Sequence, residues 1–329
     1  MTTATADAEF LEQAEPYRRE LIAHCYRMMG SHHDAEDLVQ ETMVRAWRGY
    51  GGYDRRASMR TWLHKIATNT CLTALGSSSR RPLPSGLGTD PSDPRAPLLE
   101  DHEVPWLEPF AGDDTRSGTA DPAAVVTERE SVRLAFVAAL QHLPDRQRAV
   151  LILRDVLQWR AAEVAETLGI TVATANSLLQ RARTQLKDSE RVQHSLVEPD
   201  SPTERELLRR YVDAFENYDV DAIVKLFTDK AIWEMPPFTG WYQGPENIGE
   251  LIRGNCPASG PGDQILLPTI ANGQPAFGLY MRQGDDPTHY PFQLQVLDVT
   301  ATGVAHVTVF FTDDMTALFH RFGLPARPH

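Results

Sequence analysis

The chain has 329 residues, a formal net charge of −13 at pH 7 and 42% hydrophobic residues. This length exceeds one typical domain, and the negative charge argues against indiscriminate binding to nucleic acid. No segment approaches the length of a membrane span, and the three scattered cysteines have no metal-ligand spacing. We therefore expect a cytoplasmic, multidomain protein with reduced thiols at Cys25, Cys71 and Cys256, no bound metal and no cofactor.

Residues 10–79 predict a first all-helical domain. Apolar residues recur there at helical spacing, and Val44 and Trp47 belong to this pattern. Breaks at residues 30–31 and 49–54 divide the pattern into three helices. The second helix carries DAEDLVQE, in which carboxylates flank two apolar residues. Such a face can dock on a basic partner with an apolar centre and an acidic rim, although a solvated acidic face gives the same pattern.

Charge is unevenly distributed after this motif. Residues 55–81 contain six Lys and Arg residues and no Asp or Glu, whereas residues 82–130 contain eleven acids against three arginines. The basic block predicts a nucleic-acid contact at this part of the chain, although the net negative charge of the whole chain repels nucleic acid. Residues 80–122 combine proline, glycine and acids without a sustained period, which predicts a flexible, acidic linker.

Residues 123–195 predict a second helical domain that contains a helix-turn-helix. A helix over residues 161–168 is followed by Gly169, which can adopt a left-handed turn without a steric penalty, and by Thr171, which can cap the next helix. That helix is expected to bury Val172, Ala175, Leu178, Leu179 and Ala182. Its exposed face carries side chains suited to base edges and phosphates, namely Thr174, Asn176, Ser177, Gln180, Arg181 and Arg183. The alternative is an ordinary amphipathic helix pair.

Residues 203–329 predict an α+β cone. Helices are expected over residues 204–219 and 220–237, followed by strands at 264–269, 276–282, 291–299 and 304–311. Aromatic and apolar side chains either line a pocket for a small ligand or simply fill the core, and they are Trp233, Met235, Phe238, Trp241, Tyr242, Tyr280, Phe292 and Phe310. Asp213, Asp298 and His306 are the candidate acid–base groups, but their spacing indicates no catalytic site.

Four motifs in order resemble an extracytoplasmic-function sigma factor. They are DAEDLVQETMVRAW at residues 34–47, RASMRTWLHKIATNTCLTAL at 56–75, LPDRQRAVLILRDV at 143–156 and the helix-turn-helix. The resemblance covers roughly the first three fifths of the chain. It implies two helical domains that bind bacterial core RNA polymerase and recognise the minus-ten and minus-thirty-five elements of promoter DNA.

The resemblance also implies roles for individual residues. Core polymerase would be bound by Asp34, Asp37, Leu38, Gln40 and Glu41. The loop at residues 54–58 would capture a base flipped from the minus-ten strand, and the following helix would present Thr70 beside the contact residues, which are Arg55, Arg56, Ser58, Arg60, Lys65 and Asn69. The polar face described above, from Thr174 to Arg183, would read the minus-thirty-five element. The acidic linker would thread the nucleic-acid channel of the polymerase or serve as a plain tether.

The last two fifths of the chain resemble a SnoaL-like, nuclear-transport-factor-two-like domain through short motifs. These include YVDAF at residues 211–215, WEMPP at 233–237 and GWYQG at 240–244. We expect the cone to control the sigma part in cis, because the joint at residues 197–203 is short and the cone is acidic whereas the sigma part exposes basic surfaces. The alternative is an isomerase or cyclase of the cone fold that is tethered to a polymerase-binding module.

Overall fold

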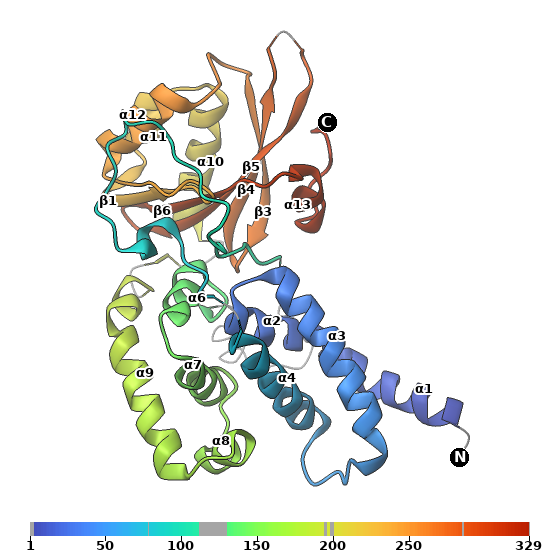
Figure 1. The fold of residues 1–329 in the computed structure, drawn as a ribbon. Helices are drawn as coiled ribbons and strands as arrows, with labels where there is room; N and C mark the ends of the chain where they lie inside the picture. The colour runs from blue at the N-terminus through green and yellow to red at the C-terminus, as the bar shows by residue number, and fades with distance from the viewer. Residues whose placement is uncertain are drawn as a thin grey trace. The chain divides into compact units, whose positions relative to one another are not determined.

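The computed structural model describes residues 3–77, 79–111, 130–193, 196–197, 201–284 and 286–328. The chain forms two compact units (Figure 1). Residues 1–81 and 107–190 make up the N-terminal unit, and residues 82–106 and 191–329 make up the C-terminal unit. Among the described residues we find no helix with the length and apolar character that a bilayer crossing requires.

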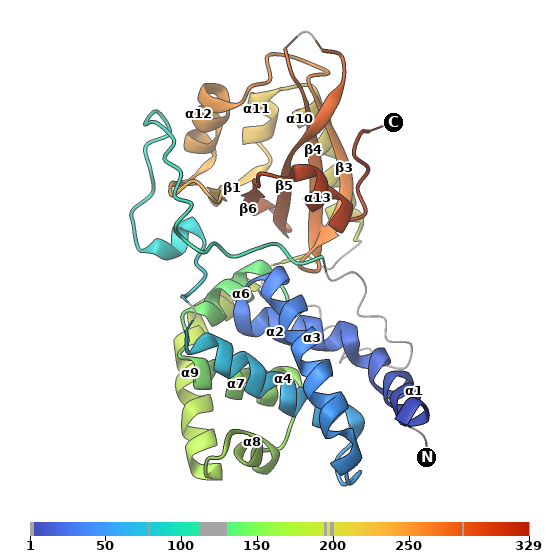
Figure 2. The same ribbon diagram turned by 45° about the vertical axis from the view of Figure 1, so that its right-hand side comes forward.

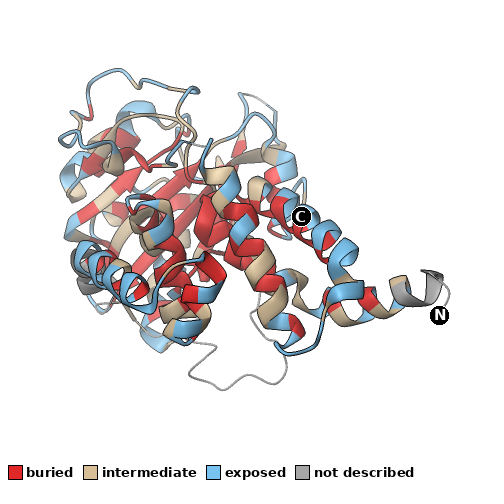
Figure 3. Ribbon diagram, turned by 60° about the horizontal axis from the view of Figure 1, so that its bottom comes forward, coloured by how far each residue is buried: buried red, intermediate tan, exposed pale blue. Residues whose placement is uncertain are grey.

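The first half of the N-terminal unit is helical, as expected. It contains α1 (Thr3–Ala14), α2 (Arg18–Met29), α3 (His32–Gly49) and α4 (Met59–Leu75). Gly30 ends α2 with a left-handed φ of 72°, a conformation that glycine adopts without a steric penalty. The Ser31 hydroxyl then caps α3 by accepting from the Asp34 amide at 3.0 Å. Buried residues follow the inner sides of these helices (Figure 3).

The second half contains α6 (Leu134–Gln141), α7 (Asp145–Leu151), α8 (Ala161–Leu168) and α9 (Val172–Gln193), with a π-helical turn at Ile152–Val156. The predicted helix-turn-helix is confirmed as α8 and α9. Gly169 is left-handed with φ of 62°, and the Thr171 hydroxyl accepts from the Thr174 amide at 3.1 Å. The expected burial of Val172 is wrong, since its side chain is 44% exposed. It begins α9, and the buried stripe starts one turn later at Ala175.

Arg148 of α7 joins the two helical halves. It is 3% exposed, and its guanidinium donates to the Met28 carbonyl in the last turn of α2 and to the Gln141 side chain at 2.9 Å. Burial lowers the pKa of Arg148 to about 10, so the side chain stays charged at neutral pH. Lys65 of α4 also pairs with Glu166 of α8 at 2.9 Å. The two halves therefore share one folded unit.

The C-terminal unit is a mixed sheet with helices, as expected of the α+β cone. Its strands are β1 (Phe227–Glu234), β2 (Trp241–Gln243), β3 (Gln264–Ala271), β4 (Gln274–Arg282), β5 (His289–Thr300) and β6 (Gly303–Phe310). They lie in the order β2-β1-β6-β5-β4-β3, with β1 and β6 parallel and all other neighbours antiparallel. The helices are α10 (Pro202–Glu216), α11 (Val220–Val224), α12 (Pro245–Asn255) and α13 (Met315–Arg321).

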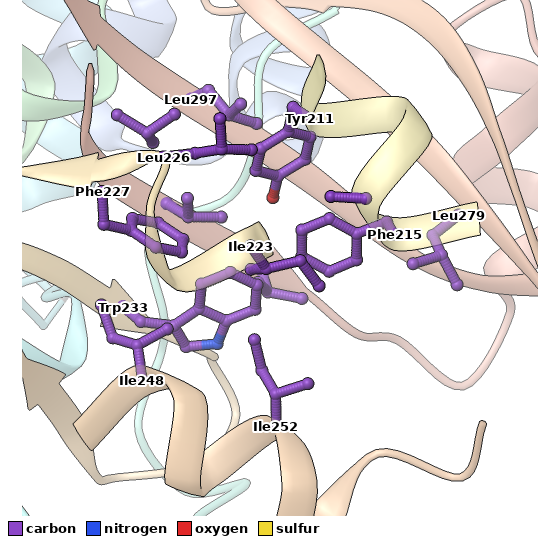
Figure 4. Close-up of a cluster of buried hydrophobic side chains, with 14 of the residues drawn as sticks. Tyr211, Phe215, Ile223, Leu226, Phe227, Trp233, Ile248, Ile252, Leu279 and Leu297 are labelled. Atoms are coloured by element: carbon purple, nitrogen blue, oxygen red, sulfur yellow. The ribbon is translucent and has the colours of Figure 1, made fainter. Parts of the chain in front are cut away.

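A dense apolar core lies between the sheet and helices α10 to α12. Figure 4 shows Tyr211 and Phe215 of α10 packed with Ile223, Trp233 and Leu279. The Tyr211 and Phe215 rings lie 4.6 Å apart, and Phe215 stacks on Trp233 at 6.3 Å. The Tyr211 hydroxyl donates to the Gln295 side chain at 2.9 Å, which satisfies a buried polar group.

The prediction of one helix over residues 220–237 is wrong beyond Val224. Helix α11 ends there, and β1 begins at Phe227. Phe227, Ala231 and Trp233 enter the core, while the strand pairs with β2 on one side and β6 on the other. These long-range pairings outweigh the local helical pattern of the segment.

The prediction of a flexible linker over residues 80–122 is wrong for its described part. Residues 82–106 belong to the C-terminal unit and run along its surface (Figure 2). Glu100 forms a β-bridge with Phe238, and the Ser92 amide donates to the Trp241 carbonyl at 2.8 Å. Residues 107–111 belong to the N-terminal unit, and residues 112–122 lie outside the described residues.

Candidate nucleic-acid interface

The polar face of α9 is fully presented to solvent. Its six predicted contact residues are all exposed, and they are Thr174, Asn176, Ser177, Gln180, Arg181 and Arg183. A groove of about 470 Å³ runs along this face, lined by Arg154, Asn176, Leu179, Gln180, Arg183 and Thr184. Amide and guanidinium groups therefore converge beside a concave surface, as base and phosphate recognition requires.

Arg154 is a groove residue that the sequence did not indicate. It lies in the π-helical turn before α8 and donates to the Trp159 carbonyl. Its sequence signal is an Arg-Asp pair within an otherwise apolar run, which is also typical of a helix surface. Across the groove, Arg183 is held by Asp155 through two hydrogen bonds of 2.9 and 2.6 Å. A phosphate would compete with Asp155 for this guanidinium.

The predicted minus-ten cations each contact an acid. The pairs are Arg55 with Glu9 at 3.1 Å, Arg56 with Asp54 at 2.9 Å, Arg60 with Glu20 at 2.7 Å and Lys65 with Glu166 at 2.9 Å. Arg55, Arg56 and Arg60 are exposed and Lys65 is half-buried, so these pairs exchange readily for phosphate contacts. Asn69 is also exposed, and its amide donates to the Lys65 carbonyl at 3.0 Å.

Two residues assigned to this surface make local hydrogen bonds in α4, and one of them, Thr70, is buried. Ser58 caps α4, since its hydroxyl accepts from the Thr61 amide at 3.1 Å. Thr70 was expected to face the DNA strand, but it is 1% exposed and donates to the Ile66 carbonyl at 2.9 Å. A helix of mixed polarity such as α4 does not reveal from its sequence which threonine is covered by α3.

The loop before α4 is closed by Tyr53. Its hydroxyl donates to the Ala57 carbonyl at 2.6 Å, and its ring stacks on Trp62 with centroids 4.7 Å apart. Within this loop, Arg55 has a φ of 59°, which is a left-handed backbone conformation that is strained for a residue other than glycine. Tyr53 thus fixes the loop that carries Arg55 and Arg56, a role that the sequence motif did not reveal.

The predicted polymerase-binding face of α3 is partly as expected. Asp37, Gln40 and Glu41 are exposed. Asp34 is half-buried and accepts from Arg81 at 2.8 Å. The placement of Leu38 at the centre of the face is wrong, because this side chain is 8% exposed and belongs to the helical core.

Two exposed apolar residues of α3 lie about one and two turns after Glu41, toward the C-terminus of the helix. Val44 is 45% exposed and Trp47 is 47% exposed, although both belong to the apolar pattern of the helix. Gln40, Val44 and Trp47 follow the spacing of one helix face. The acidic rim at Asp37 and Glu41 therefore borders an apolar surface.

The eight residues proposed for a ligand pocket do not share one face of the sheet. Trp233, Met235 and Tyr242 lie in the core cluster, and Phe238 and Phe292 pack against it. Tyr280 instead packs on Phe319 of α13 and donates to the Pro325 carbonyl. Phe310 is buried outside the core cluster, and Trp241 donates through its ring nitrogen to the Thr89 carbonyl at 3.0 Å. Because alternate residues of a strand point to opposite faces of the sheet, these eight side chains cannot all line one pocket.

The candidate acid–base groups are also separated. Asp213 is exposed and paired with Arg209 at 2.6 Å. Asp298 is buried and accepts from Gln274 at 2.8 Å, whereas His306 bonds to Glu234 at 2.7 Å. Burial lowers the pKa of His306, but the carboxylates of Glu234 and Asp298 outweigh this effect and raise the pKa above its ordinary value. Glu234 is fully buried, and no sequence signal marked it for burial.

Comparisons with protein families match three parts of the chain. Residues 14–81 match the model of sigma-70 region 2, residues 133–186 match sigma-70 region 4, and residues 208–319 match the SnoaL-like domain. The first two contain the α3, α4 and α9 surfaces described above, and the third covers most of the C-terminal unit.

Individual proteins are similar over most of the chain. The extracytoplasmic-function RNA polymerase sigma factor SigG of Mycobacterium tuberculosis is 59% identical over 318 residues, which cover 96% of this chain and 84% of SigG. The sigma factor SigJ of the same organism is 29% identical over 77% of this chain and 75% of SigJ. The crystal structure of SigJ has the same fold, with a TM-score of 0.62 over 96% of this chain and 100% of SigJ at 23% identity.

Proposed function

The chain belongs to the extracytoplasmic-function family of RNA polymerase sigma factors, and from this premise we propose the surfaces through which it works. It is a bacterial transcription initiation factor. We propose that it binds core RNA polymerase through α3 and promoter DNA through α4 and α9. The observation that carries this assignment is the exposed polar face of α9 beside its groove, because the amide and guanidinium groups gathered there suit base edges and phosphates.

The polymerase contact is assigned to a face that combines Asp37, Gln40 and Glu41 with Val44 and Trp47. The exposed apolar pair supplies the area that loses water on binding, and the acids supply complementarity to a basic partner. In this assignment the apolar part of the docking face is formed by Val44 and Trp47 and not by Leu38, which is buried.

The DNA contacts divide between the two helical halves. Arg55, Arg56, Arg60 and Lys65, with Asn69, are assigned to the minus-ten strand, because they gather on the loop before α4 and on α4 itself. Asn176 and Gln180 are assigned to base edges of the minus-thirty-five element. The neighbouring Thr174, Ser177, Arg181 and Arg183 are assigned to the same site.

The C-terminal unit is assigned a regulatory role in cis and no chemistry. Its core is filled by aromatic side chains, and its buried Glu234 already accepts hydrogen bonds from His306 and from the Ser85 amide. The chain from residue 198 onward carries eighteen acids against nine Lys and Arg residues. An acidic unit of this kind can compete with DNA for the basic surfaces of the sigma part.

Reversal of charge on α3 tests the polymerase contact. The double variant Asp37→Lys/Glu41→Lys should bind core polymerase at least tenfold more weakly, because both acids border the exposed apolar pair. A matched control is Asp229→Lys/Glu246→Lys, which makes the same charge change at exposed positions of the C-terminal unit. Affinity is measured by titration of labelled core enzyme. Equal affinity of both double variants would remove α3 as the docking face.

A further inference from the structure

The chain between the two sigma halves begins and returns at one place on the N-terminal unit. Arg81 donates to Asp34 at 2.8 Å and lies 3.7 Å from Glu108. Glu108 also caps α3, since its carboxylate accepts from the Ser31 hydroxyl at 2.9 Å and from the His32 amide at 3.0 Å. Residues 82–106 therefore form a loop whose two ends are both fixed at the N-terminus of α3.

The middle of this loop is bound to the edge of the C-terminal sheet. Strand β2 is the edge strand, and its Trp241 carbonyl accepts from the Ser92 amide at 2.8 Å. The segment before β2 continues the pairing, because Thr239 donates to the Leu99 carbonyl at 2.9 Å and Asp101 donates to the Pro237 carbonyl at 3.0 Å. These backbone bonds satisfy an edge that otherwise stays open.

Side chains strengthen the same contact. Arg95 bonds to both carboxylate oxygens of Glu250, at 2.8 and 3.1 Å, and Leu98 packs against the apolar core. Near the start of the loop, the Ser85 amide donates to Glu234 at 2.8 Å. Glu234 is fully buried, so this charge-assisted bond supports a carboxylate that has lost its water.

We propose that residues 82–106 are a strap through which the C-terminal unit holds the polymerase-binding half of the sigma part. The hold is independent of the covalent joint that follows α9. It deepens the cis control proposed above and rests on it for its biological meaning. A docked strap ties α3 to the C-terminal unit, and an undocked strap releases both α3 and the acidic segment for the polymerase.

The strap is tested by cutting the covalent joint in the full-length chain. A site for a specific protease is inserted between His194 and Ser195, so that Leu196 and Val197, which pair with β5, remain on the C-terminal fragment. After cleavage, the two fragments of the parent chain should co-elute from a sizing column at micromolar concentration. Amide hydrogen exchange of the uncut chain should also show protection at Ser92 and Asp101.

Two double variants form a matched pair. Ser92→Pro/Asp101→Pro removes the two strap amides that donate to the sheet edge, whereas Ser92→Ala/Asp101→Asn keeps them. The proline pair should weaken the association of the cut fragments at least tenfold, and the second pair should leave it within twofold. Thermal unfolding of each uncut variant reports whether both units still fold.

Two results would overturn the strap: separation of the parent fragments after cleavage, or equal retention of the proline pair and its control. The assay contains no polymerase, so its failure leaves the role in initiation untouched. Conversely, a strap that holds in this assay while removal of the C-terminal unit leaves transcription unchanged would contradict the cis control and not the strap.

Discussion

At the scale of single residues, a buried histidine pair stands out in the N-terminal unit. His24 and His64 are both inaccessible, and their rings lie edge to face at 5.2 Å. His24 bonds to the Thr68 hydroxyl at 3.0 Å, and His64 bonds to the Arg60 carbonyl at 2.9 Å. Burial lowers the pKa of both histidines below the ordinary value of 6.5, so the folded unit contains neutral rings.

This pair predicts acid sensitivity of the N-terminal unit. A lowered pKa in the folded state means that the unfolded chain takes up protons first as the pH falls below 6.5, and stability is lost through that window. Between pH 7.5 and 5.5 the free energy of unfolding should fall by about 1–3 kcal/mol. Urea unfolding of the parent and of His24→Gln/His64→Gln at both pH values measures this decrease. An equally large decrease in the variant would show that other groups cause the acid sensitivity.

The groove residues of α9 predict a division between sequence preference and affinity. Gln180→Ala removes a group suited to a base edge and should change which minus-thirty-five sequences are bound, at about 1–3 kcal/mol for the preferred base. Arg183→Ala should weaken binding to all sequences nearly equally and reduce its dependence on salt. Selection from a randomised element separates the two, and an unchanged preference in Gln180→Ala would show that α9 meets the DNA in another register.

At the scale of elements, the sequence predicted the helices and turns whose signals lie within a few neighbouring residues. The helix-turn-helix was predictable because Gly169 and Thr171 mark its turn within a few residues. Strand β1 was not, because its pairing with β6 joins residues such as Trp233 and Val307 that lie far apart in the chain. The strap has no period for the same reason, since its bonds go to distant residues. Exposure of Trp47 also escaped prediction, because an apolar stripe looks alike whether or not the protein covers it.

The cap on α3 gives a prediction at this scale. Glu108→Ala removes the carboxylate that accepts from the Ser31 hydroxyl and from the His32 and His33 amides. The N-terminal unit should lose about 1–2 kcal/mol of unfolding free energy, as expected for loss of a helix cap. Glu103→Ala, at an exposed strap position, is the matched control. Denaturant unfolding compares the two, and equal midpoints would show that the cap contributes no stability.

At the scale of the whole molecule, the N-terminal unit keeps its two helical halves together. Lys65 of α4 and Glu166 of α8 are 2.9 Å apart. The minus-ten and minus-thirty-five elements are by their names about 25 base pairs apart, which is on the order of 80 Å of duplex at about 3.4 Å per base pair. If each half contacts its proposed element, we expect the Lys65–Glu166 and Arg148–Met28 contacts to break first. A unit that holds one half through the strap and is joined in sequence to the other half can bias this equilibrium.

Run-off transcription with core polymerase tests the central claim, that this sigma factor is tuned in cis by its C-terminal unit. The template is a promoter recovered by sequencing the genomic sites bound by the tagged protein, and the intact chain is compared with a chain that ends at Ser201. Both proteins should give promoter-specific transcripts with a several-fold difference in yield, and both should still bind core polymerase. Equal yields across promoters and in the presence of cell extract would contradict the cis control, and the absence of any promoter-specific transcript would contradict the account as a whole.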